Sequence, residues 1–206
     1  MIIEMRTYQL KPRSLPETMK RFGEALPARV KLSPLGGFWY TDVGALNRII
    51  HVWPYANLGE RERIRGEAVK LGTWPPKIGE FIESMESKIL LPAPFSPPVE
   101  PRRLGGIYEF RSYIYKPGSI PQVIDIWSKA IGERVKLSPL VGAWHTELGP
   151  LNQWVHIWAY QDAGERQRIR AEAVKRGIWP PPGGSGELLV SQENVLAVPA
   201  EFSPLC

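Results

Sequence analysis

The chain has 206 residues, with 26 lysines and arginines against 21 aspartates and glutamates, which gives a formal net charge of +5. Acids and bases interleave from Glu60 to Lys70 rather than forming a basic block, so the charge does not indicate a nucleic-acid partner, and no apolar run approaches the roughly 18 residues of a membrane span. The single cysteine, Cys206, excludes an internal disulfide, and because the charged N-terminal stretch does not resemble a signal peptide, we expect a cytoplasmic protein.

The sequence contains one internal repeat. Glu4 matches Glu109, an offset of 109 − 4 = 105, and beyond an insertion near Pro182 the offset becomes 107. Each unit is therefore about a hundred residues long, which is a normal domain size. We predict two tandem domains, residues 1–100 and residues 101–206.

The first elements of each unit are a strand and a helix. Residues 2–10 alternate in polarity, which predicts a strand. Ser14 followed by Pro16 and Glu17 is typical of a capping box, so a helix is expected to begin there. That helix is predicted to end near Ser33–Pro34, because the residue before a proline resists the helical conformation.

The remaining elements follow in the order strand, strand, helix, strand. Gly37–Asp42 and Asn47–Tyr55 read as strands, Asn57 as the N-cap of a helix that stops at Gly72, and Ile82–Leu91 as a final strand. The whole order, βαββαβ, is that of a ferredoxin-like unit. The second half repeats it.

The third strand shows which of its two faces is constrained. Asn47–Tyr55 reads N-R-I-I-H-V-W-P-Y and Asn152–Tyr160 reads N-Q-W-V-H-I-W-A-Y. Alternate residues of a strand share a face, and the polar, aromatic face is kept in type while the other face changes. Two helices cover only one face of a four-stranded sheet, and exposed aromatics are costly. We therefore predict an α+β fold in which the two ferredoxin-like sheets meet through their aromatic faces as a closed barrel within one chain.

The residues predicted to line the space between the two sheets are the candidate ligand-binding residues. They are Glu4, Arg6, Tyr8, Trp39, Thr41, His51, Trp53, Glu109, Arg111, Tyr113, Trp144, Thr146, His156 and Trp158.

Several of these residues also allow a purely structural interpretation. His51 and His156 are the candidate catalytic residues, as general bases, or else are structural histidines. One histidine per half supplies too few ligands for a metal site, so no metal is expected, and no cofactor is expected either. Glu4 and Arg6 form either an internal ion pair or a clamp in which Arg6 holds a substrate carboxylate.

Residues of the second helix and the segment after it have simpler interpretations. Arg61 and Arg65, one helical turn apart, are expected to be surface charges. Trp74 is expected to plug the end of its helix against the sheet.

Three motifs carry a resemblance to a known family. E-x-R-x-Y occurs at Glu4–Tyr8, H-x-W-x-Y at His51–Tyr55, and R-x-x-x-x-A-V-K-x-G-x-W at Arg63–Trp74. In these motifs and their order, found twice, the chain resembles the NIPSNAP family. The resemblance implies a fold of the dimeric α+β barrel group, with the two units paired within one chain. That group includes cofactor-free oxygenases, haem-degrading enzymes and peroxidases. Such barrels often pair further, so a homo-oligomer of whole chains is an expectation; no catalytic residue set carries over.

Three classes of function remain open. The first is a small-molecule site in the barrel, enzymatic or purely binding, in which Arg6 or Arg111 holds an acidic group and His51 or His156 handles a proton. The second is a non-catalytic interaction module. The third is RNA binding through stacked aromatics, but Ile49–Tyr55 lacks the glycine and basic pattern of an RNA-recognition motif. The prediction is a small ligand with an acidic group and an apolar body, bound in the barrel interior.

Overall fold

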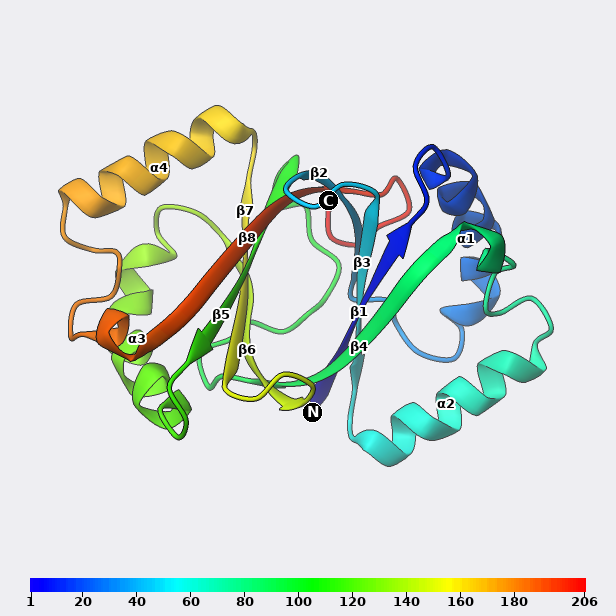
Figure 1. Cartoon of the computed structure of the whole chain (residues 1–206), viewed down its shortest axis with the longest axis horizontal. Helices are drawn as coiled ribbons and strands as arrows, with labels where there is room; N and C mark the ends of the chain where they lie inside the picture. Colours follow the sequence, from blue (N-terminus) through cyan, green and yellow to red (C-terminus); the bar gives the residue numbers. More distant parts are fainter.

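The computed structural model describes residues 1–206 as an eight-stranded antiparallel barrel flanked by four α-helices (Figure 1). None of the helices combines the length and the apolar character needed to cross a membrane. The elements in chain order are β1 (Ile2–Leu10), α1 (Leu15–Arg29), β2 (Gly37–Val43), β3 (Arg48–Tyr55), α2 (Leu58–Lys70), β4 (Ile82–Pro92), β5 (Ile107–Tyr115), α3 (Ile120–Arg134), β6 (Leu140–Leu148), β7 (Gln153–Tyr160), α4 (Ala163–Lys175) and β8 (Leu189–Pro199), with short 3-10 helices at Gly79–Phe81 and Ser185–Leu188.

The strand order confirms two ferredoxin-like halves joined into one barrel. The first half has the order β4-β1-β3-β2 and the second β8-β5-β7-β6. The barrel closes because β2 pairs with β8 and β4 pairs with β6. Figure 1 shows α1 and α2 on one flank of the barrel and α3 and α4 on the opposite flank. The α+β prediction of an intramolecular barrel is therefore correct.

The barrel is filled by apolar side chains. One buried cluster draws residues from all eight strands, and it holds the two tryptophans of β2 and β6. Its members are Ile3, Met5, Trp39, Ile50, Val52, Leu90, Tyr108, Phe110, Val141, Trp144, Val155, Ile157, Ala159, Ala197 and Leu205. The space between the two sheets is a packed core.

The prediction that the aromatic sheet faces meet inside the barrel is wrong. Tyr8 and Trp53 pack with Phe22 of α1 and Ile64 of α2 in a second cluster, outside the barrel and under the helices of their own half. Both sheet faces are buried, so burial did not distinguish them. The deciding property is polarity. The charged face is placed where arginines of α2 reach it, while the predominantly apolar face fills the closed barrel.

The helix termini follow the predictions in part. Asn57 caps α2 by accepting from the backbone N–H of Glu60, and Gly72 follows the helix with φ +72°. The side chain of Ser14 does not cap α1; its hydroxyl donates to the carbonyl of Lys11 instead. Helix α1 ends at Arg29, earlier than the predicted Ser33–Pro34.

The P-x-x-F-S-P segment that ends each half packs on the other half. Phe95 lies 6.4 Å, centroid to centroid, from Trp127 of the second half, and Phe202 lies 5.0 Å from Phe38 of the first half. The serine after each phenylalanine accepts a backbone hydrogen bond there, as Ser203 does from the N–H of Phe38. The Pro-rich stretch between β4 and β5 therefore connects the two halves and also helps to hold them together.

Candidate functional site

Each half contains a pocket between the outer face of its sheet and its helices. The first-half pocket has a volume of about 340 Å³ and the second-half pocket about 330 Å³, near the lower end of the range for small-molecule sites. A Trp-Pro-Pro segment covers each pocket, at Trp74–Pro76 and at Trp179–Pro181. The candidate site is therefore duplicated and lies outside the barrel.

A buried carboxylate anchors the charged groups of the first half. Glu4 is completely buried and accepts from Arg6 Nη1 at 2.9 Å, Arg61 Nη2 at 2.6 Å and Ser87 Oγ at 2.8 Å. Burial alone would raise the pKa of Glu4, but the hydrogen bond from Arg61 and the charges of Arg6 and Arg65 outweigh it and lower the pKa to about 2. Of the two interpretations of Glu4 and Arg6, the structure shows the internal ion pair.

The second half repeats this arrangement around Glu109. This carboxylate accepts from Arg111 and Arg166, each at 2.6 Å, and lies 3.5 Å from Arg170. Asn194 takes the place of the serine, at 3.4 Å.

The prediction that Arg61 and Arg65 are surface charges is wrong. Arg61 bonds Glu4, and a guanidinium nitrogen of Arg65 lies 3.7 Å from the same carboxylate. Helix α2 therefore presents these arginines to the sheet. The interleaved charges of its sequence suggested a solvated face, and this interpretation holds for Arg63, which pairs with Glu67 at 2.9 Å.

A second buried guanidinium in each half has no carboxylate partner. Arg29 is only 2% exposed and donates to Ser33 Oγ and to Tyr55 OH, both at 2.9 Å. Its guanidinium carbon lies 4.2 Å from the ring centroid of Trp53. Burial lowers the pKa of Arg29, and the residue lines the first-half pocket. Arg134 repeats the geometry over Trp158 at 4.0 Å.

Sequence reasoning missed Arg29 and Arg134. A signal was available, because both recur at the offset of 105 and both lie on the apolar stripe of an otherwise amphipathic helix. An arginine at a core position of a helix indicates a buried partner or a ligand.

The buried histidine of the first half accepts one hydrogen bond and has one ring nitrogen without a partner. Trp53 Nε1–H donates to His51 Nδ1 at 2.7 Å, and an indole nitrogen can only donate. Burial lowers the pKa of His51 to about 3, so the ring is neutral and Nε2 carries its hydrogen. That Nε2 has no hydrogen-bond partner, and His51 lines the pocket. This geometry suits hydrogen-bond donation to a ligand and not the role of general base.

The corresponding histidine of the second half is covered. Trp158 Nε1 donates to His156 Nδ1 at 2.8 Å, but His156 does not line the second-half pocket. The indole of Trp127 lies 4.7 Å from its ring, where the first half has the smaller Phe22. The two halves therefore share a scaffold and differ in access to the histidine.

The structure divides the predicted site residues into three groups. Those that line a pocket are Glu4, Arg6, Tyr8, His51 and Trp53 in the first half and Arg111 and Tyr113 in the second. Those buried beside the second-half pocket without lining it are Glu109, His156 and Trp158. Those placed elsewhere are Trp39 and Trp144, inside the barrel, and Thr41 and Thr146, which hydrogen-bond backbone groups of the β2–β3 and β6–β7 turns.

Two further features bear on the site. No group of three or more histidine, cysteine, aspartate or glutamate side chains is placed to hold a metal ion.

The aromatic face of the sheet is not available to nucleic acid. Trp53 is 2% exposed and offers no stacking surface to a nucleic-acid base.

Comparison with known proteins agrees with the duplicated architecture. The chain is 31% identical to "Protein NipSnap homolog 3B" of Homo sapiens over 211 residues, covering 98% of this chain and 85% of that protein. It is 30% identical to "Protein NipSnap homolog" of Dictyostelium discoideum, covering 86% and 78%.

A solved structure shares the fold over nearly the whole chain. It is a putative monooxygenase from Lactobacillus acidophilus NCFM, with a TM-score of 0.68 at 11% identity, covering 97% of this chain and 93% of the other. The family model described as NIPSNAP matches residues 3–97 and again residues 108–204, so the chain belongs to the NIPSNAP family and carries its domain twice.

Proposed function

We propose that this NIPSNAP protein binds a small acid with an apolar body in the pocket of its first half. The observation that carries the proposal is Arg29, a buried guanidinium that faces a pocket and has no carboxylate partner. With Arg6 and Arg65, three guanidiniums line this pocket against the single carboxylate of Glu4.

The charge balance of the pocket favours an anionic ligand. Burying a cation without a counter-charge is expensive, and a ligand carboxylate or phosphate would compensate for that cost. Hydrogen bonds from guanidinium to such groups are among the stronger ones in proteins. The hydrogen on Nε2 of His51 adds a neutral donor close to Arg6, whose charge contributes to the lowered pKa of that histidine.

The rest of the pocket favours an apolar ligand body. Trp74 packs against Phe22 and Trp53 at centroid distances of 5.8 Å, and these aromatic rings line the pocket. Apolar side chains complete the wall: Ile78, Ile82 and Met85. A ligand whose acidic end meets the arginines therefore buries its apolar end against this wall.

The oxygenase-like alternative is less well supported. An oxygenase without a cofactor needs a base to remove a proton from its substrate. The free nitrogen of His51 carries a hydrogen, because Nδ1 already accepts from Trp53. Binding, with His51 as a donor, agrees better with this geometry.

The test compares octanoate with octanol, which share an apolar body and differ in charge, by titration calorimetry. Octanoate is expected to bind and octanol to bind at least about tenfold more weakly. Arg65→Met removes a half-exposed guanidinium at the pocket and is expected to weaken octanoate binding by about tenfold, since charge-assisted hydrogen bonds contribute about that much.

The matched control is Arg63→Met, on the same helix but paired with Glu67 at the surface. Its octanoate affinity is expected to equal that of the wild type. Equal binding of octanoate and octanol, or equal effects of the two arginine substitutions, would show that the pocket does not select an acid.

A further inference from the structure

The second-half pocket keeps the arginines of the first but changes the opposite wall. Arg111, Arg134 and Arg170 line it, at the positions equivalent to Arg6, Arg29 and Arg65. Four apolar residues of the first half become polar or gain a donor in the second: Leu10, Phe22, Ile78 and Met85 are replaced by Tyr115, Trp127, Ser185 and Gln192.

The sheet register confirms that these positions correspond. Met85 pairs with Tyr8 across β1 and β4, and Gln192 pairs with Tyr113 across β5 and β8. Ser185 lies beside Gly186, as Ile78 lies beside Gly79. Phe22, Ile78 and Met85 therefore line the pocket that is equivalent to the second-half pocket, while Leu10, whose place Tyr115 takes, is fully buried in the adjoining core.

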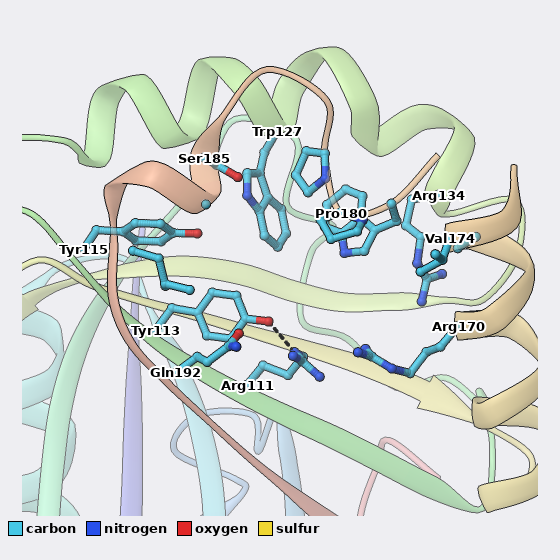
Figure 2. Close-up of a pocket in the computed structure, with 15 residues that line it drawn as sticks. Arg111, Tyr113, Tyr115, Trp127, Arg134, Arg170, Val174, Pro180, Ser185 and Gln192 are labelled. Atoms are coloured by element: carbon cyan, nitrogen blue, oxygen red, sulfur yellow. Dashed lines mark hydrogen bonds between the residues drawn. The ribbon is translucent and has the colours of Figure 1, made fainter. Parts of the chain in front are cut away.

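The donors gather at one end of the pocket. Figure 2 shows Tyr115, Trp127 and Ser185 together on one side, with Arg134 and Arg170 on the other. Tyr115 is 3% exposed, and burial raises its pKa to about 12, so its phenol keeps its hydrogen at neutral pH. The buried Nε1–H of Trp127 faces this phenol, as does the hydroxyl of Ser185, but it makes no well-formed hydrogen bond.

A hydrogen-bonded chain of side chains crosses the middle of the pocket. The hydroxyl of Tyr113 accepts from Arg111 Nε at 2.6 Å, and Arg111 in turn donates to Glu109 (Figure 2). This hydrogen-bonded chain lies between the end of the pocket that holds Arg134 and Arg170 and the end that holds Tyr115, Trp127 and Ser185.

We infer that the second-half pocket is a separate binding site for a small hydroxylated acid, whose anionic group meets Arg134 and Arg170 and whose hydroxyl groups meet Tyr115, Trp127 and Ser185. Packing alone does not account for this wall, because a buried donor without a well-formed hydrogen bond is costly and apolar residues occupy the same sequence positions in the first half. The inference shares with the proposed function the idea that the arginines hold an anion, but it concerns the other pocket and another ligand body.

The experiment uses gluconate and hexanoate, which have the same carbon chain and carboxylate and differ in the hydroxyl groups of gluconate. Binding to the full chain is measured by calorimetry and by the indole N–H signals in NMR. Gluconate is expected to shift the Trp127 signal, assigned with Trp127→Phe, and to bind this pocket about tenfold more tightly than hexanoate.

The variants exchange the two walls. Ser185→Ile with Gln192→Met gives the second pocket first-half residues and is expected to weaken gluconate binding by about tenfold. Gln192→Met alone changes an exposed residue and gives a smaller loss without risk to folding. Ile78→Ser with Met85→Gln in the first half is the reciprocal variant and is expected to leave the Trp127 response to gluconate unchanged.

The outcomes separate the two proposals. If gluconate leaves the Trp127 signal unmoved, or if the second-half variants bind gluconate as the wild type does, the inference is wrong, and octanoate binding that depends on Arg65 would still support the first-half site. If gluconate binds and octanoate does not, the first-half proposal fails and the second-half site stands.

Discussion

The two halves of this chain hold the same charged network under different pocket walls. Glu4 and Glu109 each gather arginines from their own strand and from the second helix of their half. The walls above these networks differ, and the histidine lines the pocket only where Phe22 stands instead of Trp127.

This difference shows which groups depend on one another. A buried carboxylate and its guanidiniums are stable only as a set, so the loss of one member leaves the others unpaired. A wall residue contacts the ligand space separately and can be exchanged alone. Duplication therefore kept the network and allowed the walls to differ.

The largest expected effect concerns the shared network. Glu4→Gln leaves Arg6 and Arg61 without their carboxylate and is expected to lower the free energy of unfolding by about 3 to 5 kcal/mol. Glu109→Gln should have a matching effect if the networks are equivalent. Urea unfolding followed by circular dichroism measures both effects. A loss below about 1 kcal/mol for one of the two variants would show that the arginines of that half do not depend on the carboxylate for their stability.

The pH dependence of the free energy of unfolding should come mainly from one buried histidine in each half. The folded pKa is depressed to about 3 for His51 and well below 6.5 for His156, so on acidification from about pH 6.5 the unfolded chain binds these protons first. Stability is then complete above pH 6.5 and falls by about 1.4 kcal/mol per pH unit for each histidine. Protonation linked to Glu4 adds a further loss only below about pH 4.5.

Urea midpoints at about pH 7.5 and about pH 5.5 test this, with an expected wild-type difference of about 2 to 3 kcal/mol. His51→Gln and His156→Gln should each remove a similar share of the difference, and His145, whose pKa is also lowered by burial, accounts for the remainder. An undiminished pH dependence in either variant would assign the titration to other groups.

Exchanging the residue over the histidine should sharpen the contrast between the pockets. Phe22→Trp is expected to cover His51, to cost about 1 to 3 kcal/mol of stability through overpacking, and to weaken octanoate binding. Trp127→Phe should uncover His156. Calorimetry with octanoate checks both variants, and unchanged binding in Phe22→Trp would mean that His51 does not contact the ligand.

The smallest expected effect lies away from the pockets. Asn57→Ala and Asp162→Ala each remove a side-chain cap and are expected to cost about 1 kcal/mol. Asp162 also interacts with the helix N-terminus through its charge, so its loss should exceed that of Asn57 by a few tenths of a kcal/mol at low salt. Thermal unfolding at low and high salt measures this difference, and the excess should vanish at high salt.

The sequence alone determined the repeat, the order of the elements and the family. The offset between Glu4 and Glu109 locates the second unit, and the alternation within Asn47–Tyr55 identifies a strand with a charged, aromatic face. The cap at Asn57 and the stop at Gly72 follow from local chemistry. These features depend on residues close together in the chain, which is why a single sequence carries them.

Only the tertiary structure decided which sheet face enters the barrel and where the site lies. Both faces of β1 and β3 are buried, and alternation cannot say whether helices or the other sheet will cover a given face. The decision depends on contacts between distant residues, such as Arg61 with Glu4 and Arg29 with Tyr55. Charged groups are stable where partners from another element reach them, and the interior of a closed barrel, filled by the apolar faces of all eight strands, offers no such partners.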